Sequence, residues 1–243
     1  MIPKRIGILI PSTNTSVEAD FKWVTSKAVT AHSERLAIPD GTMTPAFLDQ
    51  MNQDLAAKVT SVASASVDLI AYACTSGSFY RGPAWDEQVH DLVQRTAHVP
   101  CVTTSTAVMD AFQALDVQRI SVITPYPQWT NDKLAAYYGQ QGMDVLGVHG
   151  DVRAAAQGHR AINDQDPDDI IQFALDHFDP DAQALFCSCT AWRAAECVTA
   201  LEAALGVPVI TSNQATIWAA LRQLDMLHAA QPLGRLFTRS AVC

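Results

Sequence analysis

The sequence predicts an α/β protein made of two similar halves, each with a mostly parallel β-sheet covered by helices. Three observations indicate this fold. Apolar runs of strand length alternate with segments of helical periodicity, and the two halves of the chain share matching segments in the same order. The chain also has enough apolar material for a large core, because 49% of its 243 residues are hydrophobic and only 17% are charged.

Eight apolar runs predict the strands of these two sheets. The predicted strands are Arg5–Pro11, Arg35–Ile38, Val67–Ala73, Pro100–Thr103, Arg119–Thr124, Asp144–Val148, Ala184–Cys187 and Pro208–Ile210.

Amphipathic segments between these runs predict helices. In the first segment Val17, Phe21, Val24 and Ala28 share one helical face, and residues 15–18 (Thr-Ser-Val-Glu) match a capping box at its start. Two further segments repeat the pattern. Their apolar faces are Phe47, Met51, Leu55, Val59 and Val62, and Trp85, Val89, Leu92 and Val93.

Three pairs of segments suggest an internal repeat related by a pseudo-twofold axis. They are separated by 114, 115 and 108 positions, and they occur in the same order in both halves. The pairs are Arg5–Pro11 with Arg119–Pro125, Asp68–Thr75 with Gln183–Thr190, and Val99–Thr104 with Val207–Ser212. We expect one half to comprise residues 1–106 plus 213–243 and the other residues 107–212.

Composition and charge exclude several classes of protein. The formal net charge is −9 without a basic cluster, which argues against binding to nucleic acid. No apolar run approaches the roughly 20 residues of a membrane span, and the N-terminus lacks an export signal. We therefore expect a cytoplasmic protein that binds neither nucleic acid nor membrane.

The six cysteines are expected to be free thiols, since nothing indicates export. Cys187 and Cys189 form a C-x-C pair, but no second pair follows at the spacing of a zinc site. We therefore expect no bound metal. Cys187 is expected in the core, and no motif includes Cys101, Cys197 or Cys243.

In parallel α/β sheets, ligands bind where strands end and helices begin. Four such loops are candidates, and two of them carry Cys-Thr at the same point of each half. If the halves face each other, Cys74 and Cys189 flank one cleft from opposite sides. The four loops are Pro11–Thr15, Cys74–Ser78, Pro125–Trp129 and Cys189–Trp192.

The Cys-Thr loops have the composition of an anion site. Backbone N–H groups and hydroxyls at a helix start favour a carboxylate or a developing oxyanion, and they also favour a thiolate. We therefore expect a lowered pKa for Cys74 or Cys189. Asn14 and Tyr126 occupy the corresponding loops of the first strand in each half. The alternative roles are structural: a buried small thiol, a helix cap at Asn14 and a loop anchor at Tyr126.

These segments resemble the aspartate/glutamate racemase superfamily, in its maleate isomerase and arylmalonate decarboxylase branch, over nearly the whole chain. Residues 10–15 (Ile-Pro-Ser-Thr-Asn-Thr) are similar to the first loop of maleate isomerases. Residues 75–82 and 100–108 are closer to the decarboxylases. The branch uses no cofactor and no metal, so the resemblance implies none here.

The resemblance implies roles for several residues. Cys74 and Cys189 would be the catalytic pair. The first-loop asparagine binds a substrate carboxylate in the isomerases, and the region of residues 150–166 contributes another asparagine contact there. The residues expected to bind substrate are Asn14, Thr75, Ser76, Tyr126, Thr190, Ser12, and His159 and Asn163, the two candidates for that second contact.

Position 74 distinguishes the activities of this branch. The decarboxylases carry glycine there, whereas the isomerases and racemases have both thiols, as here. The resemblance therefore implies a maleate-type cis–trans isomerase that forms a covalent Cys74 adduct. The alternatives are a two-base racemase of an aspartate-, glutamate- or hydantoin-like or α-substituted acid, an arylmalonate-type decarboxylase, and a carboxylate-binding protein without activity. A homodimer or higher homo-oligomer is expected.

Overall fold

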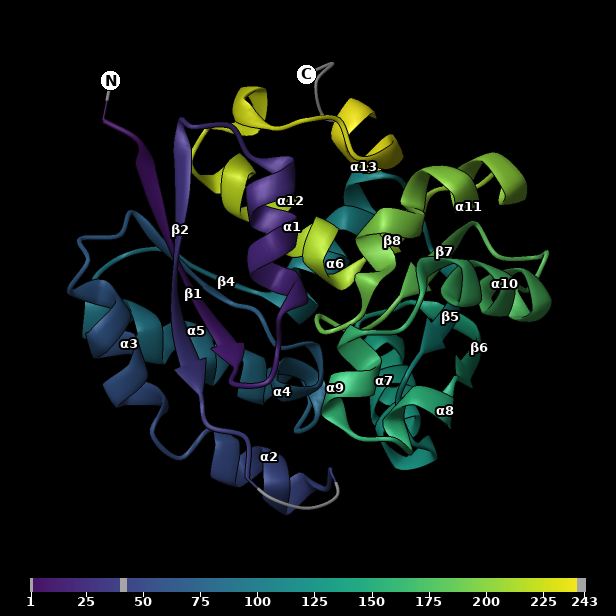
Figure 1. Ribbon diagram of the computed structural model, residues 1–243, viewed down its shortest axis with the longest axis horizontal. Coiled ribbons are helices and arrows are strands. Elements are labelled where there is room, and N and C mark those ends of the chain that lie inside the picture. Colours follow the sequence, from purple (N-terminus) through teal and green to yellow (C-terminus); the bar gives the residue numbers. More distant parts are fainter. Residues whose placement is uncertain (1, 40–42, 240–243) are drawn as a thin grey trace.

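The computed structural model describes residues 2–39 and 43–239. It contains two parallel sheets of four strands, ordered β2-β1-β3-β4 and β6-β5-β7-β8 (Figure 1). Each sheet thus has the second, first, third and fourth strand of its half in the same spatial order. The predicted fold class and the similarity of the two halves are confirmed.

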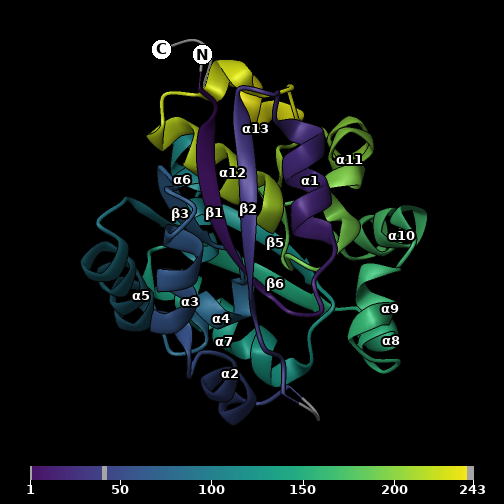
Figure 2. The ribbon, with the colours of Figure 1, turned by 60° about the vertical axis from the view of Figure 1, so that its left-hand side comes forward.

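Three strands of the first sheet, β1, β3 and β4, are mostly buried on both faces, as their near-continuous apolar sequences require. Its strands are β1 (Lys4–Pro11), β2 (Val29–Leu36), β3 (Leu69–Tyr72) and β4 (Cys101–Thr103). Helices α1 (Ser16–Val24) and α3 (Leu55–Ala63) lie on opposite sides of β1 and β2 (Figure 2). Helix α5 (Pro83–Ala97) packs beside α3 and against β4.

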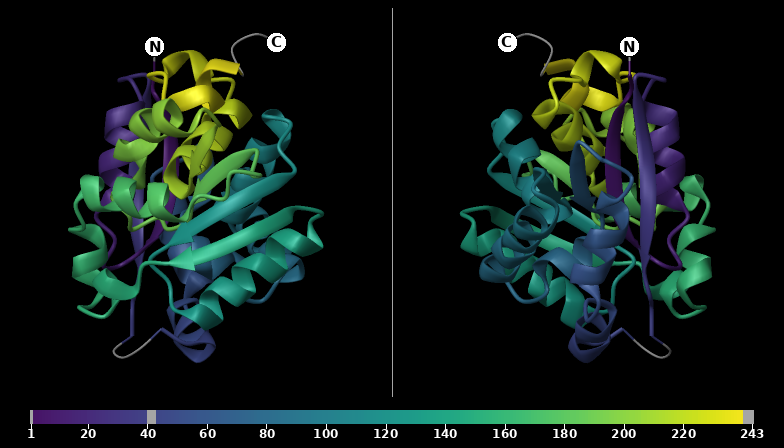
Figure 3. Two further views of the ribbon diagram at one scale, coloured as in Figure 1. Left: turned by 90° about the vertical axis from the view of Figure 1, so that its right-hand side faces the viewer. Right: turned by 90° about the vertical axis from the view of Figure 1, so that its left-hand side faces the viewer.

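The second sheet repeats this arrangement. Its strands are β5 (Arg119–Thr124), β6 (Asp144–Gly150), β7 (Ala184–Cys187) and β8 (Val209–Thr211). Helix α7 runs alongside the edge strand β6 (Figure 3). The helices of this half are α7 (Gln128–Gln140), α8 (Val152–Ala155), α9 (His159–Asn163), α10 (Pro167–His177), the 3₁₀ helix η1 (Arg193–Cys197) and α11 (Val198–Leu205).

Helices α6 (Thr104–Ala114) and α12 (Ser212–Gln223) pack against each other between the two sheets (Figure 1). The Thr216 hydroxyl donates a hydrogen bond to Thr104 Oγ1 at 3.0 Å, and Trp218 is buried. Helix α12 begins with a complete capping box between Thr211 and Gln214. This helix pair therefore forms much of the core that joins the halves. The remaining elements are α2 (Pro45–Met51), α4 (Thr75–Phe79), η2 (Leu227–Ala229) and α13 (Gly234–Arg239).

One strand was misplaced by the sequence analysis. We predicted the second strand at Arg35–Ile38, but β2 covers Val29–Leu36. This strand is at the edge of its sheet, and its exposed residues, Ala31 and Ser33, alternate with less exposed ones. An apolar run is therefore a poor signal for it, because only one side of an edge strand is bonded to a neighbour.

Two helical predictions also need correction. The predicted capping box at Thr15 does not form; instead Asn14 Oδ1 accepts hydrogen bonds from the backbone N–H groups of Ser16 and Val17. Helix α1 ends at Val24, so Ala28 is outside it. The segment from Phe47 to Val62 is divided into α2 and α3, and the Asn52 amide donates to the Leu48 carbonyl in the turn between them.

The domain boundaries at residues 106/107 and 212/213 stay a prediction, since the sheets themselves occupy residues 4–103 and 119–211. Cys243 lies outside the described residues. Of the helices the structure describes, none is long and apolar enough to cross a membrane.

The two caps give a stability test. Replacing Thr211 by alanine removes the capping box of α12 and should lower the free energy of unfolding by about 1 kcal/mol. Replacing Thr15 should change it by less than about 0.5 kcal/mol, because its side chain makes no capping bond. Urea unfolding followed by circular dichroism measures both, and equal losses would contradict the assignment of the caps.

Candidate active site

A cavity of about 500 Å³ lies between the two halves, where the strands of both sheets end. Each half contributes its Cys-Thr loop to the wall. The lining residues are Pro11, Thr13, Asn14, Ile38, Met43, Phe47, Leu48, Met51, Cys74, Thr75, Ser76, Pro125, Tyr126, Pro127, Val152, Ala156, Gly158, His159, Ile162, Cys189, Thr190 and Ala191. The two thiols expected to face one cleft therefore line the same cavity.

Cys74 lies between β3 and α4, at the N-cap of that helix. Only 4% of the residue is exposed, and its Sγ is 4.0 Å from the Ser76 hydroxyl oxygen. Burial raises the pKa of the Cys74 thiol to about 12, against hydrogen bonds from the Gly77 N–H and from Ser76 that lower it. The nearby Cys189 adds a smaller upward shift of this pKa, so the two sulfurs act on each other electrostatically.

Cys189 follows β7 in the second half and is 8% exposed. Burial raises the pKa of this thiol as well. Hydrogen bonds from the Tyr126 side chain and from the N–H groups of Ala191 and Trp192 act in the opposite direction. Tyr126 also hydrogen-bonds the Thr75 side chain, so its phenol connects the two cysteine loops.

The predicted lowering of the thiol pKa values is therefore wrong. The backbone N–H groups are present as expected, but loss of solvation around a buried thiolate outweighs them. No lysine or arginine belongs to the described cavity lining, so no full positive charge offsets the burial.

Neutral hydrogen-bonding groups surround the thiols. Asn14, Thr75, Ser76, Tyr126 and Thr190, all predicted to bind substrate, line the cavity and are buried. Several are tied to protein groups across the two halves: Asn14 Nδ2 donates to Thr190 Oγ1 at 3.2 Å, and Thr75 Oγ1 donates to Ser212 Oγ at 2.8 Å. Hydroxyls and amides of this kind can bind a carboxylate.

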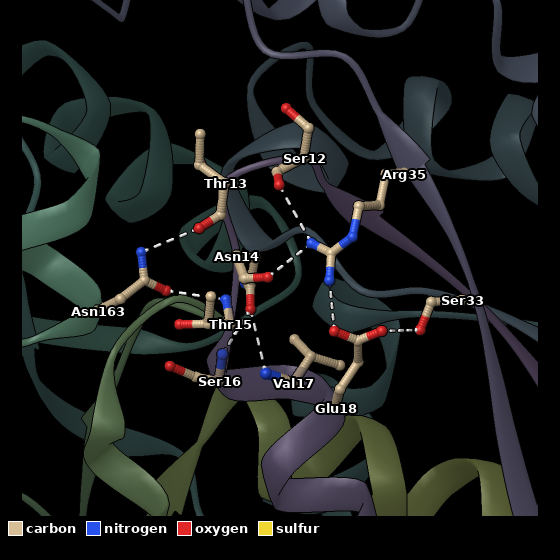
Figure 4. A network of polar contacts seen from close by, with 10 residues as sticks. All are labelled: Ser12, Thr13, Asn14, Thr15, Ser16, Val17, Glu18, Ser33, Arg35 and Asn163. Carbon is tan, nitrogen blue, oxygen red and sulfur yellow. Dashed lines mark hydrogen bonds and ion pairs between the residues drawn. The ribbon is translucent and has the colours of Figure 1, made fainter.

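The first loop is fixed by a network around Asn14 (Figure 4). Its side-chain oxygen caps α1, and its backbone carbonyl accepts a hydrogen bond from Arg35 Nη1 at 2.8 Å. Arg35 also donates to the Ser12 carbonyl and pairs with Glu18, which accepts from Ser33. Asn14 therefore both caps helix α1 and lines the cavity.

Two of the predicted binding residues have other contacts. Ser12 is absent from the cavity lining, and its hydroxyl accepts a hydrogen bond from the Ile38 N–H. Asn163 is also absent from it; its amide accepts from the Thr15 N–H and donates to the Thr13 and His159 carbonyls (Figure 4). Both side chains shape the loops around the cavity instead of facing it.

The cavity also has an apolar wall, which the sequence analysis did not assign to a site. His159 lines it and stacks on Phe47, with ring centroids 5.8 Å apart. Burial lowers the pKa of His159, which favours the neutral form of the ring. Helical periodicity alone assigned Phe47 and Met51 to a core face and gave no signal for this second role. The apolar residues of the wall are Ile38, Met43, Phe47, Leu48, Met51, Val152, Ala156 and Ile162.

No group of histidine, cysteine or acidic side chains in the described part of the chain is arranged to hold a metal ion. The titratable side chains that line the cavity are the two thiols, the Tyr126 phenol and the His159 imidazole.

Two similar α/β halves each place a cysteine in one shared cavity. This arrangement defines the class of the protein: an α/β protein with a site between its halves that contains two cysteine thiols. A family model for arylmalonate decarboxylase matches residues 6–237, and the chain belongs to that family.

Individual relatives include both activities of the branch. The chain is 26% identical to the arylmalonate decarboxylase of Bordetella bronchiseptica, over 99% of this chain and 95% of the relative. It is 28% identical to a maleate isomerase of Nocardia farcinica, over 98% and 97%. A solved structure of a cysteine-to-serine mutant of the Nocardia farcinica maleate cis–trans isomerase, with a covalently bound succinylcysteine intermediate, matches with a TM-score of 0.87 at 24% identity, covering 96% of this chain and 98% of the other.

The raised pKa of Cys74 can be measured by alkylation with iodoacetamide. Below its pKa a thiol is ionised about tenfold more with each pH unit, so the rate at Cys74 should keep rising from about pH 7 to about pH 10. Mass spectrometry of the peptides gives the rate, with N-acetylcysteine as a control that levels off near about pH 9. A plateau at Cys74 in the same range as the control would contradict the raised pKa.

Proposed function

We propose that this protein is a cofactor-independent isomerase of a small carboxylic acid that uses Cys74 and Cys189. The reaction we favour is a maleate-type cis–trans isomerisation through a covalent Cys74 adduct. The observation that carries the proposal is the pair of buried thiols on one cavity, each with at least one backbone N–H group that hydrogen-bonds its sulfur.

The reaction would proceed by addition and elimination. The Cys74 thiolate adds to one alkene carbon of a cis-enedioate, and the π electron pair moves to the other alkene carbon, where the Cys189 thiol supplies a proton. The central bond is then single and rotates. Cys189 takes the proton back, the double bond re-forms, and Cys74 leaves as the thiolate. No atom or electron is gained or lost, so no co-reactant is needed.

The positions of the polar side chains support this scheme. Thr75 and Ser76 are next to one thiol and Thr190 is next to the other. Tyr126 connects the two cysteine loops, and Asn14 donates a hydrogen bond to Thr190. Hydrogen bonds from such neutral groups would hold the two carboxylates and orient the alkene between the sulfurs.

Relatives support the same chemistry. Maleate isomerase is the activity of the Nocardia farcinica relative, and the intermediate named for the Nocardia enzyme, a succinylcysteine, is the adduct that thiolate addition to a four-carbon enedioate produces. The cysteine at position 74 favours this activity over the decarboxylase of the Bordetella relative, since the resemblance implies glycine there in decarboxylases.

One observation favours a second candidate, a two-base racemase of an α-substituted acid. A four-carbon diacid has no apolar substituent, yet Phe47, Met43 and Met51 form an apolar wall with neutral His159. A cavity of about 500 Å³ also lies in the size range that holds larger ligands. In this reaction one thiolate removes the α-proton and the opposite thiol returns a proton to the other face.

Substitution tests the role of the two thiols. Cys74→Ser and Cys189→Ser should each lower turnover by about a thousandfold or more, because each removes one reacting group. Cys101→Ser is the matched control, since Cys101 is also a buried free thiol but does not line the cavity. Melting temperatures verify that each variant is folded. Full activity in either cavity variant would overturn the proposal.

Hydrogen exchange separates the two candidate reactions. In deuterated water a racemase should label its substrate at the α-carbon, whereas addition, rotation and elimination return the proton without obligatory α-labelling. Proton NMR of maleate, aspartate, glutamate, hydantoins and substituted malonates with the full-length protein follows both conversion and labelling. Binding without conversion of any of these acids would favour a carboxylate-binding protein.

The apolar wall can be tested in the same screen. Phe47→Ala should raise KM for acids with an aryl or alkyl substituent and leave KM for maleate within about twofold, because only the larger substrates contact that wall. An equal rise for both kinds of substrate would assign Phe47 to the fold instead of to substrate selection.

A further inference from the structure

A buried amide holds the Cys189 loop from behind. Asn213, the second residue of α12, donates from Nδ2 to the Thr190 carbonyl at 3.0 Å. The same nitrogen donates to Asp20 Oδ2 on α1 at 2.6 Å. All three residues are buried, and Asn213 Oδ1 has no hydrogen-bond partner among the described residues. Hydrogen bonds therefore link Asp20 through Asn213 to Thr190, the residue that follows Cys189.

Hydroxyls hold the Cys74 loop from the matching place. The Ser78 hydroxyl donates to the Thr75 carbonyl at 2.8 Å and contacts the Ser105 hydroxyl at 2.6 Å. Ser105 is the second residue of α6, as Asn213 is of α12. The Trp85 indole also donates to the Gly77 carbonyl of this loop. The two cysteine loops thus have corresponding supports, and the support behind Cys189 includes the carboxyl group of Asp20.

The first turn of helix α1 and the loop before it contact the Cys189 loop at two further points. Asn14 donates to the Thr190 hydroxyl, and the Ser16 hydroxyl donates to the Ala191 carbonyl at 2.9 Å. Ala191 also supplies one of the N–H groups that stabilise a thiolate at Cys189. A change in how α1 holds this loop therefore changes the hydrogen bonding of the sulfur.

Asp20 can change its charge near neutral pH. Burial raises its pKa to about 7, against a hydrogen bond from Asn213 that lowers it. Glu196 raises this pKa and Arg193 lowers it, and these two residues of η1 pair with each other. The first two turns of α12 contain no charged residue.

Three other charged residues of α1 and the adjacent strand β2 are in ion pairs. Glu34 pairs with Lys58, and Arg35 pairs with Glu18 of α1 itself. Among the interactions that lower the pKa of Asp20, the hydrogen bond from Asn213 is the largest.

The charge on Asp20 determines which way the Asn213 amide points. A carboxylate only accepts hydrogen bonds, so it requires the NH₂ group, which then also reaches the Thr190 carbonyl. A protonated carboxyl needs an acceptor, which the amide provides if it turns by half a rotation and presents Oδ1. Its oxygen then faces the Thr190 carbonyl, and that carbonyl loses its donor.

We propose that Asp20 is a positioning residue for Cys189, whose carboxylate acts through Asn213 to fix the Thr190 carbonyl and the loop that carries the thiol. The contribution of Asp20 to turnover rests on the proposed function. The effect of Asp20 on the reactivity of the Cys189 thiol does not rest on it, and this reactivity can be measured without a substrate.

The first experiment compares alkylation of the two cavity thiols in the full-length protein at about pH 6 and about pH 8. Both thiols have raised pKa values, so their thiolate fractions rise in parallel and the ratio of Cys189 to Cys74 labelling should be constant unless a third group titrates. We expect this ratio to rise about fivefold in the unmodified protein and to stay flat in Asp20→Asn, whose amide oxygen still accepts from Asn213.

Three outcomes decide the question. A ratio of Cys189 to Cys74 labelling that does not change with pH in the unmodified protein would overturn the proposal. A ratio that falls as the pH rises would also overturn it, because simple repulsion between the Asp20 carboxylate and the Cys189 thiolate produces a fall. A rise that persists in Asp20→Asn would also overturn it. Ser105→Ala, which alters the hydroxyl support of the Cys74 loop, is the matched control and should keep the pH dependence of the ratio.

Activity provides a second readout. Asp20→Ala removes the acceptor and should lower kcat/KM by about ten- to a hundredfold, whereas Asp20→Asn should retain most activity at about pH 8 and lose the acidic limb near neutral pH. If Asp20→Ala does not fold, the pH profile of Asp20→Asn decides alone. Unchanged labelling and activity in a folded Asp20→Ala would overturn the proposal, whereas normal labelling shifts without turnover of any acid would contradict only the proposed function.

The stability of Asp20→Asn has a predicted sign. The pKa of Asp20 is higher in the folded protein than in the unfolded chain, so its contribution to stability is present at low pH and is lost as the pH rises through about 7. Asp20→Asn should therefore raise the melting temperature relative to the unmodified protein more at about pH 8 than at about pH 5. An equal change at both pH values would mean that Asp20 does not titrate in this range.

Discussion

Burial of two thiols in one cavity whose described lining contains no lysine or arginine is the constraint on which the rest of the site depends. Removing a thiolate from water is unfavourable, and it raises the pKa of both Cys74 and Cys189. The opposing interactions are short-range hydrogen bonds from Gly77, Ala191 and Trp192 N–H groups, together with the Tyr126 phenol in the second half. Such bonds act only when the loops have one geometry, so the reactivity of the sulfurs depends on how firmly the loops are held.

The fold supplies that geometry by joining residues far apart in the sequence. Parallel strands bring the Cys-Thr loops to the same edge of each sheet, and α6 and α12 fix the sheets against each other. The hydrogen bonds from Asn14 to Thr190 and from Thr75 to Ser212 then cross between the halves. The contacts that join the two halves are therefore also the contacts that build the cavity.

Strong local signals made most of the fold predictable. Cys74 and Cys189 each end a buried apolar run and recur 115 positions apart, so an internal repeat was enough to bring them together. Features determined by long-range contacts were not predictable. Edge strand β2 lacks an apolar run. The Asn163 side chain hydrogen-bonds the backbone N–H of Thr15, 148 residues away. The sign of the thiol pKa shifts depends on how much solvent the folded chain leaves around each sulfur. Phe47 has the same helical spacing whether it faces a core or a cavity.

The unequal supports of the two thiols agree better with some reactions than with others. A racemase moves a proton in both directions between equivalent bases, and for it two matched loops would suffice. Addition and elimination require different tasks, since one sulfur bonds to carbon while the other transfers a proton. Hydroxyl groups of Ser78 and Ser105 support the loop of the proposed nucleophile, and the carboxyl group of Asp20 supports the loop of the proposed acid. An ionisable group such as Asp20 is useful behind the thiol that transfers a proton, which is Cys189 in the proposed isomerisation. This placement favours isomerisation with Cys74 as the nucleophile.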